Sequence, residues 1–272
     1  MSVITLLSDW GLTDHYTASV KGVILSRCNN ATVVDISHNI SSFNVKQAAF
    51  ILKNSWKNFP SGTIHIVCIN SIENKDVSHI LVKAEGHYFI CADNGLLSLV
   101  LEQEPELIKQ ITTMQSSPYF TFPERDRLAV VAAEIANGTD IDKIGDTIDR
   151  IRKFTISEPH KDKNNTVTAI VEYIDSYENV FLNITKEQVN KFFDRQDFVI
   201  SFRNLTINRL VKTYDEVLEG EACMLFASNG NLQIAVCNGK AASLLGIKID
   251  DRIRITPKSK PQLKQNSLFN SI

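Results

Sequence analysis

The stretch VITLLSDWGLTDHYTASVKGVILSRCNNATVVDIS, residues 3–37, decides the fold class. It opens with a short apolar run at 3–7, which predicts a strand that ends in the turn cluster SDWG at 8–11. Residues 16–26 then predict a helix, and residues 32–36 predict a buried strand. A strand, a helix and a second strand in this order indicate a parallel pair of strands with a helix packed against it.

Strand and helix signals continue to alternate beyond this unit. Helices are predicted at 45–55 and 127–136, and strands at 64–69, 80–84 and 88–91. Strands separated by helices of this length are typical of a mostly parallel sheet with helices on both faces. We therefore expect an α/β N-terminal domain over residues 1–157.

The composition changes after this domain. Residues 158–165 are polar, contain a proline and lack periodicity, so they predict a linker. Beyond them strands dominate, with one helical piece at 186–193 and strands predicted at 167–174, 180–184, 197–202, 224–227, 232–236 and 252–255. Short polar turns between so many strands favour a smaller all-β barrel as the C-terminal domain, residues 166–272.

Composition and charge restrict the class of protein. The chain has 272 residues, is 43% hydrophobic and carries a formal net charge of -2, so we expect neither nucleic acid nor a membrane as a partner. No apolar run approaches the roughly 20 residues that cross a bilayer. The N-terminus lacks the cationic lead of a signal peptide, and the five scattered cysteines suit a reducing cytoplasm better than a zinc site. We expect a cytoplasmic protein without a metal.

Two polar residues follow strands of the predicted parallel sheet, where ligands bind in such folds. Asp9 could hold a ribose, because a carboxylate accepts hydrogen bonds from two adjacent hydroxyls; the alternative is that it caps a turn. His38 is the best single histidine for a site role, and a structural, hydrogen-bonded histidine is the alternative. The sequence contains no GxGxxG after the first strand, no GxxxxGK[ST], no GxSxG and no HExxH.

Six stretches together resemble one enzyme family, the S-adenosyl-L-methionine (SAM) hydroxide adenosyltransferases, which belong with the fluorinases and chlorinases that also attack SAM. They follow the family's order along the chain and read LLSDWGLTDHY (6–16), VVDISH (33–38), NVKQAA (44–49), ADNGLL (92–97), IDSYENVFLNI (174–184) and ASNGNLQIAV (227–236).

The resemblance implies a fold, an assembly and a ligand. The fold is an α/β domain followed by a β-barrel domain, and the assembly is a homotrimer whose sites lie between subunits. The family's residues map onto ligand roles here: Asp9 to the ribose diol, Phe43 near the ligand, Tyr177 and Tyr214 around adenine, Asn179 to an adenine edge, Asp175 to the methionine ammonium, Ser228 to the methionine end, and Phe122 and Phe181 to the wall. For each residue, the alternative is a core aromatic or a polar side chain in a turn.

The resemblance also implies a reaction, but this sequence lacks the residues that carry it out in the family. Family members orient and partly deprotonate water with an Asp, an Arg and a His, and those positions hold Asn70, Val77 and Pro123. None of these accepts a proton at neutral pH. Glu73 and Glu124 could replace them as base, or both could be solvated loop charges.

We therefore expect cleavage of SAM by water to adenosine and L-methionine, with SAM as substrate and no cofactor. The alternatives are a protein that binds SAM or adenosine without turnover, and adenosyl transfer to another nucleophile.

Overall fold

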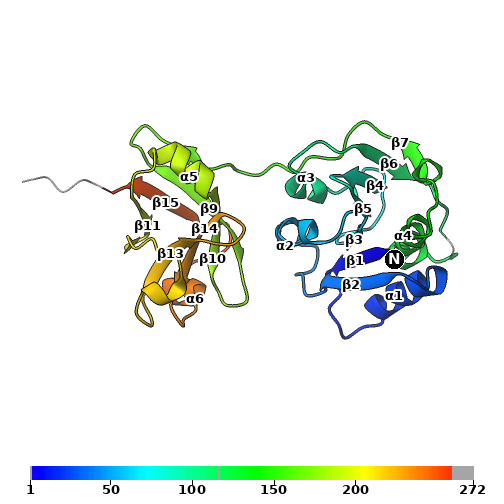
Figure 1. Ribbon diagram of the computed structural model, residues 1–272, viewed down its shortest axis with the longest axis horizontal. Coiled ribbons are helices and arrows are strands. Elements are labelled where there is room, and N and C mark those ends of the chain that lie inside the picture. Colours follow the sequence, from blue (N-terminus) through cyan, green and yellow to red (C-terminus); the bar gives the residue numbers. More distant parts are fainter. Residues whose placement is uncertain (1, 116, 259–272) are drawn as a thin grey trace, which may run out of the picture. The chain divides into compact units, whose positions relative to one another are not determined.

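The computed structural model describes residues 2–115 and 117–258, which form two compact units divided between Thr155 and Ile156 (Figure 1). Each unit has its own hydrophobic core. Within the stretch predicted as a linker, strand β8 (His160–Lys161) pairs with the first long strand of the C-terminal unit. The end of the predicted C-terminal domain, 259–272, lies outside the described residues. In the described part of the chain, no helix is both long and apolar enough to cross a membrane.

The N-terminal unit is built on a seven-stranded sheet with the order β2-β1-β3-β5-β4-β6-β7. Its strands are β1 (Val3–Ser8), β2 (Thr32–Ser37), β3 (Ile64–Cys68), β4 (His79–Ala84), β5 (His87–Ala92), β6 (Leu107–Ile111) and β7 (Gly145–Thr147).

This sheet is mixed, which corrects the expectation of a mostly parallel one. Strands β2, β1, β3 and β5 are parallel to one another, whereas β4, β6 and β7 pair antiparallel. The turn Glu85-Gly86 joins β4 directly to β5, and so short a connection can link only antiparallel neighbours. The parallel half brings the carboxyl ends of β1, β2 and β3 to one edge of the sheet.

Helices cover both faces of the sheet, as the sequence predicts. Alternate residues of β1 separate the faces: Ile4 and Leu6 pack with α1 and α4, while Leu7 packs with α2 and α3. The helical segments of this unit are α1 (Tyr16–Arg27), α2 (Val45–Lys53), η1 (Trp56–Asn58), α3 (Leu96–Val100), one π-helical turn η2 (Glu124–Leu128), α4 (Ala129–Ala136) and η3 (Ile141–Lys143).

The C-terminal unit is an antiparallel, nearly closed, barrel-like sheet. Its strands follow the order β12-β11-β15-β9-β10-β14-β13, and an isolated bridge between Leu210 and Met224 lies near the open edge. The strands are β9 (Val167–Ile174), β10 (Val180–Thr185), β11 (Phe198–Phe202), β12 (Leu205–Ile207), β13 (Ala222–Phe226), β14 (Asn231–Val236) and β15 (Arg252–Pro257), and the helical segments are α5 (Lys186–Phe193), η4 (Tyr214–Glu216) and α6 (Ala241–Leu245).

Candidate functional site

Asp9 and Phe43 meet at the carboxyl ends of β1 and β2. The backbone N–H of Phe43 donates to Asp9 Oδ2 at 2.7 Å. Phe43 has a positive φ of 64° and its side chain is 66% exposed. A bulky residue in this left-handed region is strained, and such strain gathers at functional sites. The contact uses one acceptor position of the Asp9 carboxylate, which has about four in all.

Glu124 lies in the same region of the N-terminal unit, at the first position of the π-turn η2. Single π-turns inside helices are frequent at functional sites. Burial raises the pKa of Glu124 above its usual range, although its own backbone N–H and the nearby Ser71 side chain oppose the rise, and the charge of Asp9 adds to it. The same two carboxylates, after burial itself, raise the pKa of Cys68 at the end of β3. The charges of Asp9 and Glu124 therefore act on each other and on Cys68, and we call these two carboxylates the acidic cluster.

Asn70 and Glu73 lie in the loop that follows β3. Asn70 is exposed and has a positive φ of 48°, a conformation that asparagine tolerates better than most residues. Glu73 Oε2 accepts from Arg127 Nη1 at 2.5 Å. Arg127 Nη1 also lies 3.3 Å from His79 Nδ1, and His79 Nε2 donates to the Ser71 carbonyl at 2.8 Å. This contact chain ties the loop after β3 to the turn that carries Glu124.

Phe122 is packed into the N-terminal core rather than displayed on the surface. Its ring is 7% exposed and meets Trp10 and Tyr16 edge to face, at centroid distances of 5.6 and 5.2 Å. Its position two residues before Glu124 lets it anchor η2, and its role in lining a ligand stays a prediction.

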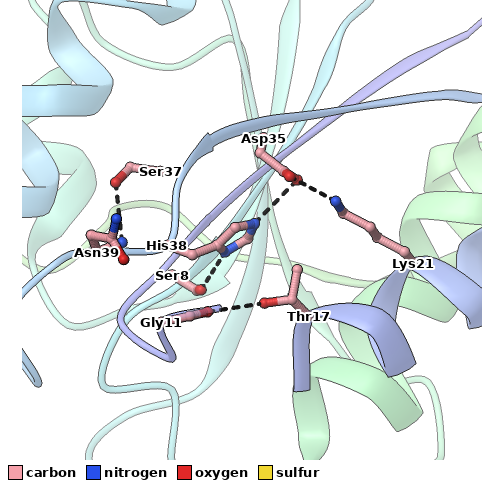
Figure 2. Close-up of polar contacts among 8 residues, drawn as sticks. All are labelled: Ser8, Gly11, Thr17, Lys21, Asp35, Ser37, His38 and Asn39. Carbon is pink, nitrogen blue, oxygen red and sulfur yellow. Dashed lines mark hydrogen bonds and ion pairs between the residues drawn. The ribbon is translucent and has the colours of Figure 1, made fainter. Parts of the chain in front are cut away.

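A second polar network lies at the ends of β1 and β2, and we call it the His38 network: Ser8, Asp35, His38 and Lys21. Figure 2 shows the His38 ring between Ser8 and Asp35, with Lys21 on the far side of Asp35. The distances are 2.6 Å for Ser8 Oγ to His38 Nδ1, 3.1 Å for His38 Nε2 to Asp35 Oδ1, and 2.6 Å for Lys21 Nζ to Asp35 Oδ2. Burial raises the pKa of Asp35, but hydrogen bonds from Lys21 and His38 outweigh it and the net pKa is lowered.

Asp175, Tyr177 and Asn179 share the turn between β9 and β10 in the C-terminal unit. Asp175 Oδ1 accepts from the backbone N–H groups of Tyr177 and Asn179, at 3.0 and 2.8 Å. The Asn179 amide donates to Asp175 Oδ2 at 3.0 Å. The turn holds the Tyr177 side chain 77% exposed. The carboxylate and the aromatic ring predicted to bind the ligand are therefore presented together.

Phe181 and Tyr214 come from neighbouring parts of the same unit. Phe181 on β10 pairs in register with Gln233 on β14, and the Tyr214 hydroxyl donates to Gln233 Oε1 at 2.8 Å. The charge of Asp175 also raises the pKa of Tyr214, after the larger effect of burial. These contacts place both aromatic residues near the Asp175 turn.

Ser228 is the predicted C-terminal residue that lies apart from this group within the unit. It is exposed in the turn between β13 and β14. Thr185, the last residue of β10, pairs with Asn231 just after that turn, whereas the Asp175 turn adjoins the first residue of β10. The register thus puts Ser228 at the opposite end of β10, and its place at the methionine end stays a prediction.

Glu178 and Lys240 also contact each other beside the Asp175 turn. Glu178 has a positive φ of 62°, pairs with Lys240 Nζ at 3.2 Å and accepts from the Ser243 backbone N–H at 2.9 Å. Two residues that lie 62 positions apart in the sequence are thus partners in the fold.

Sequence reasoning missed Ser8 and Lys21 of the His38 network and the contacts of Arg127 and His79. The spacing of Glu124 and Arg127 at i and i+3 on one helical turn was the available signal for Arg127. The sequence carries no such signal for His79, because only the tertiary fold brings its partners close to it.

Both units match models of one family over most of their length. The model of the SAM hydroxide adenosyltransferase N-terminal domain matches residues 4–145, and that of the C-terminal domain matches residues 169–254. The chain belongs to the SAM hydroxide adenosyltransferase family. This confirms the resemblance seen in the sequence.

Individual relatives agree with the family match. An (R)-S-adenosyl-L-methionine hydrolase from Methanocaldococcus jannaschii is 31% identical to this family member, covering 94% of this chain and 96% of the relative. A fluorinase from Actinoplanes sp. is 24% identical, covering 70% of this chain and 74% of the relative. A crystal structure of a conserved protein from Thermotoga maritima has a TM-score of 0.84 at 30% identity, covering 93% of this chain and 99% of that chain.

Proposed function

We propose that the protein is an enzyme that cleaves SAM with water to adenosine and L-methionine. The observation that carries the proposal is the acidic cluster of Asp9 and the buried Glu124, at the edge of a sheet in a member of this family. The named hydrolase relative, similar over 94% of the chain, supports the same reaction.

The reaction requires the protein to position water and SAM and to supply a base. The oxygen of water attacks C5′, the C5′–S bond breaks, and its electron pair goes to sulfur, which leaves as a neutral thioether without a general acid. We propose that Glu124 takes the proton that water loses. A carboxylate whose pKa is raised by burial is a stronger base than a solvated one. No resident cofactor is needed for this step, and we propose none.

Glu124 is a better candidate base than the other two residues considered. The Glu73 carboxylate is engaged by Arg127 at 2.5 Å and is 39% exposed, so it is neither free nor buried. The Asn70 amide is neutral and orients water at most. We propose that Glu73 and Arg127 hold the loop, while Glu124 acts on the water.

We propose ligand roles for the remaining predicted residues as the resemblance implies them. Asp9 binds the ribose diol near Phe43, Asp175 binds the ammonium group, and the aromatic residues stack on or enclose the adenine. The aromatic residues with these proposed roles are Phe43, Phe122, Tyr177, Phe181 and Tyr214. Asn179 binds an adenine edge, and Ser228 lies at the methionine end.

We propose a homotrimer in which neighbouring subunits complete each ligand site. The support is that Phe43 and Tyr177 expose large aromatic surfaces, 66% and 77%, each on its own unit. Sedimentation of the full-length protein should give three times the chain mass of 30.5 kDa. A cytoplasmic location is likewise proposed, and five free cysteines support it.

Product analysis tests the function. Full-length protein is incubated with SAM, and adenosine and methionine are resolved by chromatography, with calorimetry on the same batch. Glu124→Gln should lower turnover by at least about a hundredfold while leaving the affinity for adenosine within a factor of about three, because it removes only the proton acceptor. Glu73→Gln is the matched control and should retain most of the turnover. Equal rates for Glu124→Gln and the parent would eliminate Glu124 as the base.

Binding without turnover is the second candidate function. It is favoured by Asn70, Val77 and Pro123 at the positions where the resemblance implies water-activating residues. Heat of binding with SAM but no release of adenosine or methionine would select it over hydrolysis.

A further inference from the structure

The His38 network ends at Ser8, the residue directly before Asp9. Its order of serine, histidine and aspartate resembles that of a hydrolytic triad, but the Ser8 hydroxyl is too buried to act as a nucleophile. Ser8 is 1% exposed and His38 is 3% exposed, so no substrate reaches either side chain. A buried chain of polar contacts fixes geometry instead.

The network fixes the backbone on both sides of Asp9. Ser8 is held through its hydroxyl by the His38 ring at 2.6 Å, and Gly11 donates its N–H to the His38 carbonyl at 2.7 Å. Thr17 Oγ1 adds a longer contact of 3.5 Å to the Gly11 carbonyl (Figure 2). One residue therefore anchors the two ends of the short segment that carries Asp9.

A bulge in β2 makes this arrangement possible. Leu6 pairs with Asp35 and Leu7 pairs with Ser37, so Ile36 has no partner on β1. A bulge changes which side chains face the same way along a strand. Asp35 can therefore lie beside the His38 ring, and Lys21 reaches Asp35 from α1.

The chemistry of the partners sets the direction of each hydrogen bond. A carboxylate only accepts, so Asp35 favours a proton on His38 Nε2. In the neutral ring, Nδ1 then accepts from the Ser8 hydroxyl. The alignment of Ser8 thus depends on Asp35 and, through it, on Lys21.

We propose that His38, oriented by Asp35 and Lys21, is a positioning residue that aims the Asp9 carboxylate at the ribose diol of the ligand. This rests on the proposed function, which gives Asp9 its ligand. Asp9 is also tied to the loop after β2 by the Phe43 N–H, so His38 and Phe43 hold it from the same loop. A carboxylate that is already fixed in place loses less conformational freedom when it binds two adjacent hydroxyls than a mobile one does, so it binds them more tightly.

The test measures discrimination between two nucleosides rather than activity. Calorimetry on full-length protein gives Kd for adenosine and for 2′,3′-dideoxyadenosine, which lacks the diol. The parent should prefer adenosine by about 10- to 100-fold, the range that hydrogen bonds to a charged acceptor provide. In His38→Ala the preference should fall below about threefold, with Kd for the dideoxy compound nearly unchanged. A merely structural residue would lower Tm and leave the preference intact.

Two further variants keep the test decisive. His38→Asn places an amide near the position of Nδ1 and should restore part of the preference. Lys21→Met leaves the His38–Ser8 contact in place and should give an intermediate preference, and it serves alone if His38→Ala does not fold. Lys83→Met is the matched control, because the Lys83–Glu106 pair is similarly exposed and 2.8 Å long but lies outside the His38 network.

The outcomes separate the two proposals. If the parent binds neither nucleoside, the proposed function is wrong. If the parent binds both equally, Asp9 does not hold the diol and the positioning proposal is wrong, while nucleoside binding stands. If the parent prefers adenosine and His38→Ala and Lys21→Met keep the full preference, the positioning proposal alone is wrong.

Discussion

Acidification should destabilise the N-terminal unit through a buried histidine that the reaction does not use. His65 on β3 is fully buried, with Nδ1 2.7 Å from Thr5 Oγ1 and Nε2 3.1 Å from His87 Nδ1. Burial, followed by the charge of His87, lowers the pKa of His65 from 6.5 to about 3. The folded unit thus favours a neutral imidazole at this position.

The sign and the size of the effect follow from linkage. Because the folded pKa lies below the unfolded pKa, His65 contributes its full stability above about pH 6.5 and loses it as the pH falls from 6.5 towards 3. Between these two pH values the unfolded chain binds a proton at His65 and the folded chain does not. Between pH 8 and pH 5 the free energy of unfolding should fall by about 2 kcal/mol from this group, at about 1.4 kcal/mol for each pH unit below 6.5.

Tryptophan fluorescence reports this loss selectively. The chain has two tryptophans, Trp10 and Trp56, and both lie in the N-terminal unit. The Trp56 ring lies 6.4 Å from the ring of His65. Urea unfolding of the full-length protein is followed at pH 8, 7, 6 and 5, in the parent and in His65→Gln, which cannot titrate. The variant should lose about 2 kcal/mol less than the parent over this range. Equal pH dependence in the two proteins would refute the assignment to His65.

Substitutions at three positions test other local arguments. Glu178→Gly should change Tm less than Glu178→Ala, because both lose the side-chain contacts but only glycine relieves the left-handed φ of 62°; thermal denaturation with equal shifts would contradict this. Gly145→Ala should destabilise the N-terminal unit by at least about 2 kcal/mol in urea, because its Cβ would lie 1.8 Å from the Gln110 carbonyl oxygen. At Gly22 on α1 an added Cβ meets no atom of the described residues within 4 Å beyond its own helix backbone and chain neighbours. Gly22→Ala should therefore stabilise the N-terminal unit by about 1 kcal/mol, and a destabilised variant would count against the helix argument.

Local periodicity was sufficient for the elements that form the core. The predicted strand at 167–174 and helix at 186–193 coincide with β9 and α5. Both have strong signals: alternating burial in β9, and in α5 a capping box in which Thr185 accepts from the Gln188 backbone N–H. Where a segment's own pattern determines its structure, the sequence predicts it.

Partner-dependent elements were not predicted. Strand β7 has three residues and forms at the edge of the sheet only because β6 is there to pair with it. Helix α3 is five residues long, and its N-cap is Gly95, which has a φ of 91°. A helix this short has no stability of its own and depends on packing against α2. The mixed sheet has the same origin, because strand direction beyond the β4–β5 hairpin is decided by neighbours.

The choice between the two candidate carboxylates likewise depends on the tertiary fold. In the sequence, nothing separates Glu73 from Glu124: each is an acidic residue in a predicted loop, Glu73 after the strand at 64–69 and Glu124 before the helix at 127–136. In the structure, Arg127 binds Glu73 from 54 positions away, while η2 buries Glu124 where the charge of Asp9 acts on it. One carboxylate is thereby paired with a cation, and the other has its pKa raised by burial. Sequence spacing alone identifies which residues can reach this edge of the sheet, and the packing of η2 against the loop after β3 determines which of them is buried there.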